Sequence, residues 1–127
     1  MEKRSISTKK APEAIGPYSQ GIIIGDLVFL SGQIGVDPET GKMVEGGVLN
    51  QARQIFANIN NVLEEAGCLI DDIIKATVFL KSMDDFKNVN TIYSEIFSLP
   101  YPARSAIEVA GLPLNADIEI EVIAKKT

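Results

Sequence analysis

The sequence contains no histidine and no tryptophan, and it has a single cysteine among its 127 residues. Without histidine there is no Ser-His-Asp triad, no Cys-His pair, no HExxH zinc site and no imidazole that could act as an acid or a base. One cysteine cannot close a disulfide within the chain or supply a structural zinc site. Any chemistry must therefore come from other side chains.

Long apolar runs are also missing. The longest uninterrupted stretches, such as residues 22–24 and 27–30, are far shorter than the roughly 20 residues that span a bilayer. The basic residues near the start of the chain are not followed by an apolar segment of the kind found in secretory signals. The sequence therefore predicts a protein that does not enter a membrane and that stays in the cytoplasm.

Positive charge is scarce in the body of the chain. There are 12 Lys and Arg residues against 17 Asp and Glu, and six of the cations lie in residues 1–10 and 125–127. Residues 11–124 therefore hold six cations against sixteen acidic residues. Nucleic-acid binding takes most of its affinity from cations that neutralise phosphates, so this acidic body argues against a nucleic-acid partner. The basic ends are better interpreted as solvated termini than as an arm for a polyanion.

The composition suits one hydrophobic core. Apolar residues make up 46% of the chain, which is enough to exclude disorder. There are no internal repeats, low-complexity tracts or linker-like changes in composition. We therefore expect residues 1–127 to form a single domain.

Hydrophobic periodicity predicts a hairpin followed by a helix. Two β-rich runs lie on either side of Gly25 and Asp26, a two-residue connection that suits a tight turn. Apolar positions three and four residues apart then predict a helix over about residues 48–66, with Gly67 as its C-terminal cap. Turn-forming residues predict a connection between them, and a short edge strand is expected near Ile6.

Alternation of apolar and polar residues predicts strands at residues 73–81, 103–109 and 118–124. Between the first two of these strands, the apolar positions from Phe86 to Phe97 have helical spacing and predict a second helix, which follows Asp84 and Asp85 and is ended by the prolines at 100 and 102. Residues 112–117 are predicted to form a loop. The side chains of the first strand that are expected to face the core are Ile74, Ala76, Val78 and Leu80.

This order of elements predicts an α+β fold: a two-layer sandwich in which two helices cover one face of a mixed β-sheet. The other face is predicted to carry Phe79 and Ile123 together with Glu119 and Glu121. A face that mixes apolar and charged groups suits a subunit interface with polar pockets better than bulk water.

Arg104 is the first candidate for a functional role, because it is the only cation between Lys87 and Lys125 and lies within a predicted strand. Its guanidinium could bind a small carboxylate through two parallel hydrogen bonds, a charge-assisted interaction worth about 1.5 to 3 kcal/mol. It could equally form a structural ion pair with Glu108 or Glu119. The spacing alone does not decide between these two interpretations.

The sequence gives weaker support for a functional role of other polar residues. Glu119 could act as a general base toward water if it lies near Arg104, although a solvated strand carboxylate is the simpler interpretation. Because histidine is absent, the hydroxyls of Tyr18, Ser19 and Ser31 are better suited to hydrogen bonding than to covalent catalysis.

Three further features favour structural roles. Lys75 fits a surface cation as well as it fits a Schiff-base lysine. Cys68 follows the helix-capping Gly67 and is better interpreted as a small buried hydrophobe than as a reactive thiol. The glycines form neither a GxxxxGK[ST] nor a GxGxxG phosphate loop.

Five segments of the sequence occur together in a recognisable order that takes in nearly the whole chain, from residue 12 to residue 125. They are residues 16–20 (GPYSQ), 31–34 (SGQI), 51–54 with 63–67 (QARQ and LEEAG), 76–80 (ATVFL), and 102–105 with 118–120 (PARS and IEI). In this order and spacing they resemble the RidA family (reactive intermediate deaminase, formerly YjgF).

The resemblance implies a chorismate-mutase-like α+β fold and a homotrimer whose sheets form a central β-barrel, with three sites in the clefts between subunits. It also implies hydrolysis of 2-iminobutanoate and 2-iminopropanoate, released by pyridoxal-phosphate dehydratases, to 2-oxo acids and ammonia. The partners would then be small imino-acid and 2-oxo-acid ligands. An imine is already electrophilic, so this hydrolysis needs neither a cofactor nor a metal.

The resemblance also assigns roles to residues. Arg104 would hold the substrate carboxylate, and Glu119 would position or activate the attacking water. The residues that would line the pocket are Tyr18, Ser31, Gly32, Phe86, Asn90 and the main chain near Ala106. Many active family members carry cysteine where this chain has Ala106, which argues against a thiol-dependent chaperone role and leaves the Arg and Glu roles intact.

Two other functions stay open at the level of sequence. The same fold could serve as a non-catalytic trimer that binds small carboxylates or regulates a partner, because fold does not guarantee function. A ribonuclease or translation-inhibitor role, attached to some family members, is disfavoured by the acidic body.

Overall fold

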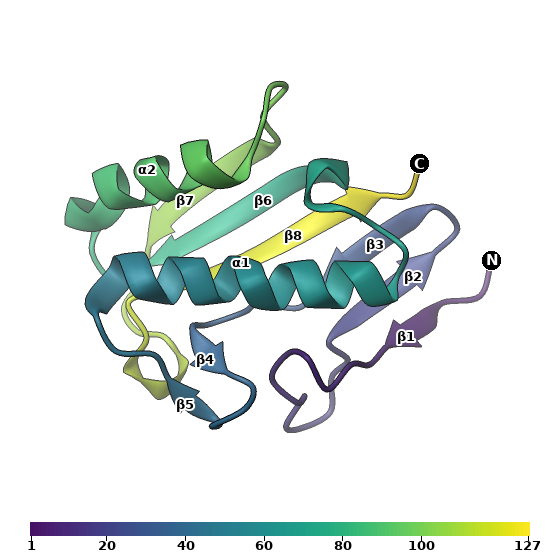
Figure 1. Ribbon diagram of the computed structural model, residues 1–127, viewed down its shortest axis with the longest axis horizontal. Helices are drawn as coiled ribbons and strands as arrows, with labels where there is room; N and C mark the ends of the chain where they lie inside the picture. The colour runs from purple at the N-terminus through teal and green to yellow at the C-terminus, as the bar shows by residue number, and fades with distance from the viewer.

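The computed structural model describes residues 1–127. Its main sheet has six strands in the order β1-β2-β3-β8-β6-β7, and two α-helices lie against one face of this sheet (Figure 1). The strands are β1 (Arg4–Ile6), β2 (Gly21–Ile24), β3 (Leu27–Leu30), β6 (Ile73–Leu80), β7 (Ala103–Glu108) and β8 (Ile118–Lys125), and the helices are α1 (Gly47–Glu65) and α2 (Phe86–Ile96). Strand β7 pairs with β6 in parallel and every other pairing in the sheet is antiparallel, so the predicted α+β class with a mixed sheet is confirmed.

The N-terminal third forms the predicted hairpin. In the β2-β3 pair, Ile24 lies opposite Leu27, and Gly25 between them has a φ of +59° that a glycine adopts without strain. Strand β1 pairs with β2, which confirms the edge strand expected near Ile6. The turn after β3 lies between two short strands that the sequence did not predict, β4 (Val36–Asp37) and β5 (Lys42–Met43).

Helix α1 ends as its sequence predicts. Gly67 follows the helix with a φ of +79°, and the N–H of Cys68 donates to the carbonyl of Leu63 over 2.8 Å. This arrangement satisfies carbonyls that the last turn would otherwise leave unpaired. The helix buries one face, which includes Ile55, Ile59 and Val62, against the sheet.

Strand β6 departs from the prediction at one point. A register shift between Ile73 and Lys75 turns Ile73 into the core and leaves Ile74 47% exposed, so the expected core position of Ile74 is wrong. A bulge of this kind adds one residue to a strand and reverses the facing of the side chains before it. From Ala76 onward the predicted alternation holds, and the strand ends at Leu80.

Helix α2 connects the parallel strands β6 and β7. A 3-10 turn at Met83–Asp85 precedes it, and Val89, Ile92 and Tyr93 form its buried face. Two further 3-10 turns, Ile70–Asp72 and Pro113–Asn115, lie in connections, and the second of them occupies the predicted loop before β8.

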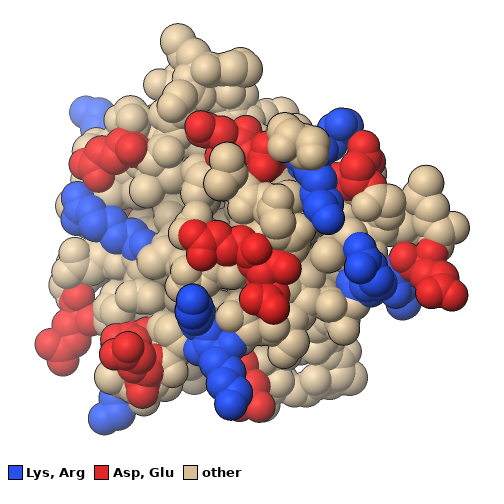
Figure 2. All heavy atoms as spheres, turned by 45° about the vertical axis from the view of Figure 1, so that its right-hand side comes forward, with Lys and Arg blue, Asp and Glu red and all other residues tan.

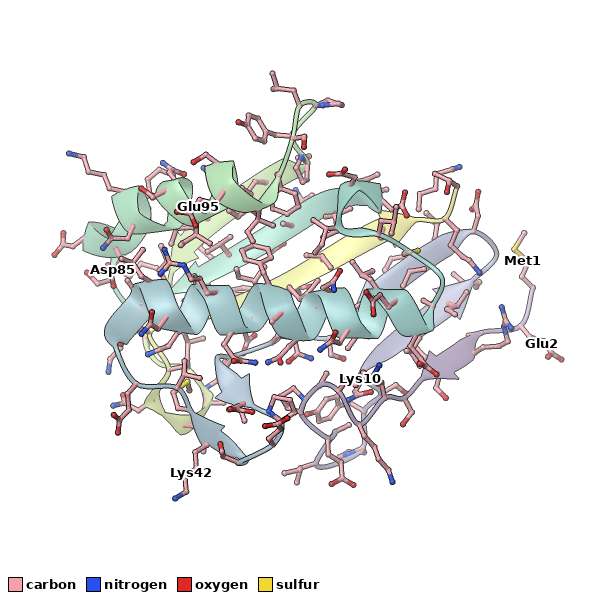
Figure 3. The ribbon with its side chains drawn as sticks, viewed as in Figure 1. Met1, Glu2, Lys10, Lys42, Asp85 and Glu95 are labelled. Atoms are coloured by element: carbon pink, nitrogen blue, oxygen red, sulfur yellow. The ribbon has the colours of Figure 1, made fainter.

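The hydrophobic core lies between the helices and the sheet, where 25 buried residues form one cluster. The two helices also meet at the surface through an ion pair between Arg53 of α1 and Glu95 of α2, with nitrogen and oxygen 3.6 Å apart. Glu95 is labelled on α2 in Figure 3. No helix combines the length and the apolar content that crossing a membrane would need.

Candidate functional site

Arg104 lies on β7, the edge strand next to α2. It is in register with Ala76 of β6, whose side chain is buried beneath the helices, so Arg104 points to the helix-covered side of the sheet. Its Nη1 donates to Oδ1 of Asn90 over 2.8 Å. Its Cζ lies 5.0 Å from the ring centroid of Phe86 and 4.8 Å from that of Tyr93. These three partners are four and three residues apart, which places them on one face of α2.

No carboxylate of the chain pairs with Arg104. The two ion pairs in the structure join Arg53 to Glu95 and Lys125 to Asp26. Glu108, one predicted partner, instead accepts a hydrogen bond from the main-chain N–H of Met83 over 2.9 Å. The interpretation of Arg104 as half of an ion pair within the chain is therefore wrong. An arginine has five N–H donors, and the structure uses one of them, so most of the planar fork stays available to a ligand.

A cavity adjoins the guanidinium. It has a volume of about 430 Å³ and lies between α2 and the segment that leads into β7. The residues that line it are Asn90, Tyr93, Ser94, Tyr101, Pro102 and Arg104. Ala106 follows on the same side of β7, in register with the buried Val78.

Glu119 lies on the opposite face of the sheet. It is in register with Phe79 of β6, on the face that the helices do not cover, and its side chain is half-buried. Burial raises the pKa of the Glu119 carboxyl above its usual value, and the negative charge of Glu121 raises it further. A carboxylate with a raised pKa is a stronger base once it is ionised.

Gly32 lies directly against this carboxylate. A Cβ atom at position 32 would lie 2.5 Å from Oε2 of Glu119, closer than real Cβ contacts come, so only glycine fits without moving the carboxylate. The neighbouring Ser31 is fixed by its hydroxyl, which donates to the carbonyl of Ser19 over 2.6 Å. Tyr18 is exposed and shares with Gly32 a second cavity of about 460 Å³.

The predicted site residues, together with Tyr93, thus form two groups within the chain. The first, which we call the arginine half, comprises Arg104, Phe86, Asn90, Tyr93 and Ala106. The second, which we call the glutamate half, comprises Glu119, Gly32, Ser31 and Tyr18. Strand β6 separates β7 from β8, and the two halves face opposite sides of the sheet, so one chain does not bring Arg104 and Glu119 together.

Tyr93 is the residue of this group that sequence reasoning did not single out, because its spacing in α2 marked it only as an apolar core position. The signal that could have found it is its spacing, because Phe86, Asn90 and Tyr93 are four and three residues apart and so share one face of the helix. Cys68 is 1% exposed, and burial raises the pKa of its thiol, so its interpretation as a buried hydrophobe is confirmed. No group of three His, Cys, Asp or Glu side chains is arranged to hold a metal ion.

The chain is similar to known proteins over nearly its whole length. Residues 8–126 match the family described as Endoribonuclease L-PSP. A goat (Capra hircus) protein named 2-iminobutanoate/2-iminopropanoate deaminase is 47% identical over 124 residues, which cover 98% of this chain and 90% of that protein.

Two crystal structures have the same fold. The structure of RidA from the Antarctic bacterium Psychrobacter sp. matches with a TM-score of 0.93 and 43% identity, over 96% of this chain and 98% of that one. The structure of the YjgF gene product from E. coli matches with a TM-score of 0.93 and 45% identity, over 98% of this chain and 99% of that one. The chain is therefore similar to both proteins in sequence as well as in fold.

Proposed function

The chain belongs to the Endoribonuclease L-PSP family, which includes the RidA and YjgF proteins, and on that premise we propose that it is a 2-iminobutanoate/2-iminopropanoate deaminase. The whole chain acts as one domain and hydrolyses reactive imines to 2-oxo acids and ammonia. The observation that carries this proposal is the state of Arg104, a half-buried guanidinium that is oriented by its neighbours and has no carboxylate partner in the chain.

Arg104 binds the carboxylate of the substrate. Both imines carry a carboxylate directly next to the imine carbon, and the planar fork of a guanidinium matches two carboxylate oxygens. Asn90 holds one Nη and leaves the remaining donors free for the ligand. Fixing the carboxylate in this way also fixes the position of the imine carbon one bond away.

Glu119 activates the water. As the water oxygen bonds to C2 of the imine, the C=N π bond breaks, its electron pair and a proton go to the nitrogen, and the Glu119 carboxylate accepts a proton from the water. The resulting carbinolamine then loses ammonia: the protonated Glu119 returns its proton to the nitrogen, the C–N bond breaks with its electron pair on the nitrogen, and the hydroxyl releases its proton to solvent as the C–O bond becomes the carbonyl of the 2-oxo acid. The raised pKa of Glu119 supports this role, because it makes the ionised carboxylate a better proton acceptor.

The complete site lies between subunits. Because one chain separates the arginine half from the glutamate half, we assign them to neighbouring subunits of a homotrimer whose sheets surround a central barrel. Tyr18, Ser31 and Gly32 then face Arg104 of the next chain, together with Phe86 and the main chain near Ala106. The uncovered sheet face supports this assembly, because Phe29 and Ile107 on it are 39% and 46% exposed.

The family's description also names a ribonuclease, and the charges of this chain do not favour that activity. Cationic and acidic side chains lie interspersed on the face shown in Figure 2, and the whole chain carries a formal charge of −5. A surface of this kind offers little attraction to a polyanion.

The experiment that tests the proposal generates 2-iminobutanoate with a threonine dehydratase and traps the remaining imine with semicarbazide. Wild-type protein suppresses formation of the semicarbazone, and Arg104→Ala does not. The matched control is Arg53→Ala, which removes an arginine whose ion pair with Glu95 lies on the helices. This variant retains wild-type suppression.

The outcomes separate deamination from binding alone. Absence of suppression by a folded wild-type trimer contradicts deaminase activity, and calorimetric binding of 2-oxobutanoate by the same trimer then identifies a carboxylate-binding protein. An Arg104→Ala protein that is folded and fully active contradicts the role of Arg104.

A further inference from the structure

Arg104 is held in place mainly by aromatic rings. Arginine side chains are long and flexible, and binding must overcome the loss of their rotamer freedom if the side chain is free beforehand. Here a single hydrogen bond, to the exposed Asn90, restrains the guanidinium. The remaining contacts are those with Phe86 and Tyr93, both within the roughly 6 Å over which a cation and a ring attract each other.

The two rings differ in how firmly they are themselves held. Phe86 is half-buried at the first residue of α2. Tyr93 is only 6% exposed and packs against Phe56 and Phe97, with ring centroids 5.8 Å and 4.9 Å away. Tyr93 therefore connects the guanidinium directly to the rigid core.

The hydroxyl of Tyr93 takes no part in this contact. It is buried and has no hydrogen-bond partner in the structure, which is rare for a buried polar atom. Burial raises the pKa of Tyr93 to about 12, so the phenol stays neutral and offers no charge to compete with a substrate carboxylate for Arg104. The Arg104 guanidinium contacts the face of the Tyr93 ring instead.

We propose that Tyr93 is a positioning residue that holds the Arg104 guanidinium ready for the substrate carboxylate. It acts through its contact with Arg104. The proposal rests on the proposed function for the identity of the ligand, but the effect of the ring on the mobility of Arg104 can be measured without any ligand.

The test compares three variants of the full trimeric protein. Tyr93→Leu removes the ring, and Tyr93→Phe keeps it and removes the unpaired hydroxyl. Phe97→Leu is the matched control, because it removes a ring from the same aromatic cluster and leaves both rings that contact Arg104 in place. Thermal denaturation of all three separates loss of core packing from loss of positioning.

Two readouts are measured on each variant. Nitrogen-15 relaxation of the Arg104 Nε–H reports the mobility of the guanidinium in the free protein, and calorimetry reports the affinity for 2-oxobutanoate. In Tyr93→Leu we expect the Nε–H order parameter to fall and the affinity to weaken by roughly fivefold to thirtyfold, the worth of a partly desolvated cation–π contact. In Tyr93→Phe and Phe97→Leu both values stay near wild type, although Phe97→Leu is less stable.

Two results overturn the inference. One is an Arg104 Nε–H as rigid in Tyr93→Leu as in the wild type. The other is a Phe97→Leu protein that loses order at Arg104 to the same extent, which would mean that any loss of core packing has this effect. Failure of the wild-type protein to bind 2-oxobutanoate contradicts the proposed function instead, and the relaxation data still decide the role of Tyr93.

Discussion

The two halves of the proposed site are built to different degrees within one chain. In the arginine half, a ring from the core, a second ring and an amide from the same helix all hold Arg104. In the glutamate half, no hydrogen bond from the chain reaches the carboxylate of Glu119, and burial raises its pKa. The proposed binding group is therefore held in place within one chain, whereas the proposed base has no hydrogen-bond partner within the chain.

The largest expected effect comes from removing the proposed base, Glu119. This change affects the chemical step and leaves the binding group in place. Glu119→Gln keeps the shape of the side chain and removes its ability to accept a proton. We expect kcat to fall by roughly a hundredfold to ten-thousandfold, the usual contribution of a general base. Affinity for 2-oxobutanoate, measured by calorimetry, changes little because the arginine half is intact. A variant with wild-type kcat would contradict the assignment of the base.

Displacing the carboxylate without removing it gives the next largest effect. In Gly32→Ala the new Cβ occupies the space next to Oε2 of Glu119, so the carboxylate must shift. A misplacement on the order of 1 Å can reduce a rate by roughly a hundredfold, and we expect a loss of kcat of that size with a smaller change in stability.

The matched control for this substitution is Gly111→Ala. Gly111 has no atom within 4 Å of an added Cβ and no left-handed backbone conformation. Stopped-flow measurement of imine loss with both variants makes the comparison. Equal kcat values for the two alanine variants would show that contact with Gly32 does not set the position of Glu119.

The sequence predicted the residues of each half, but it did not predict that the two halves face opposite sides of the sheet within one chain. Alternation in the last strand correctly placed Glu119, Glu121 and Ile123 on one face, because side-chain period is a local property. It could not show that β7 pairs with β6 on the side away from β8, since strand order and register depend on pairing between distant segments. For the same physical reason the bulge that exposes Ile74 was not predicted.

The smallest expected effect is a change in the pKa of Glu119 when its neighbour Glu121 is neutralised. Burial raises the pKa of Glu119, and the charge of Glu121 adds to this increase, so Glu121→Gln should lower the pKa of Glu119. The base works in its ionised form, so kcat/KM falls as the pH drops through the raised pKa. In Glu121→Gln this acid limb therefore moves to lower pH.

The shift can be checked in two ways. Carbon-13 titration of the Glu119 carboxyl follows the group directly, and the pH profile of kcat/KM follows its effect on the rate. An acid limb that stays in place or moves to higher pH in Glu121→Gln would show that Glu121 does not contribute to the pKa.

The most direct test of the shared site is complementation between two inactive chains. Arg104→Ala and Glu119→Gln chains carrying different affinity tags are expressed together, and trimers that retain both tags are purified. If each site takes Arg104 from one subunit and Glu119 from the next, every mixed trimer contains one intact site, and its activity recovers to roughly one third of the wild-type value. If each chain builds its site alone, the activity of the purified mixed trimers stays at the level of the separate variants, and the shared site is contradicted.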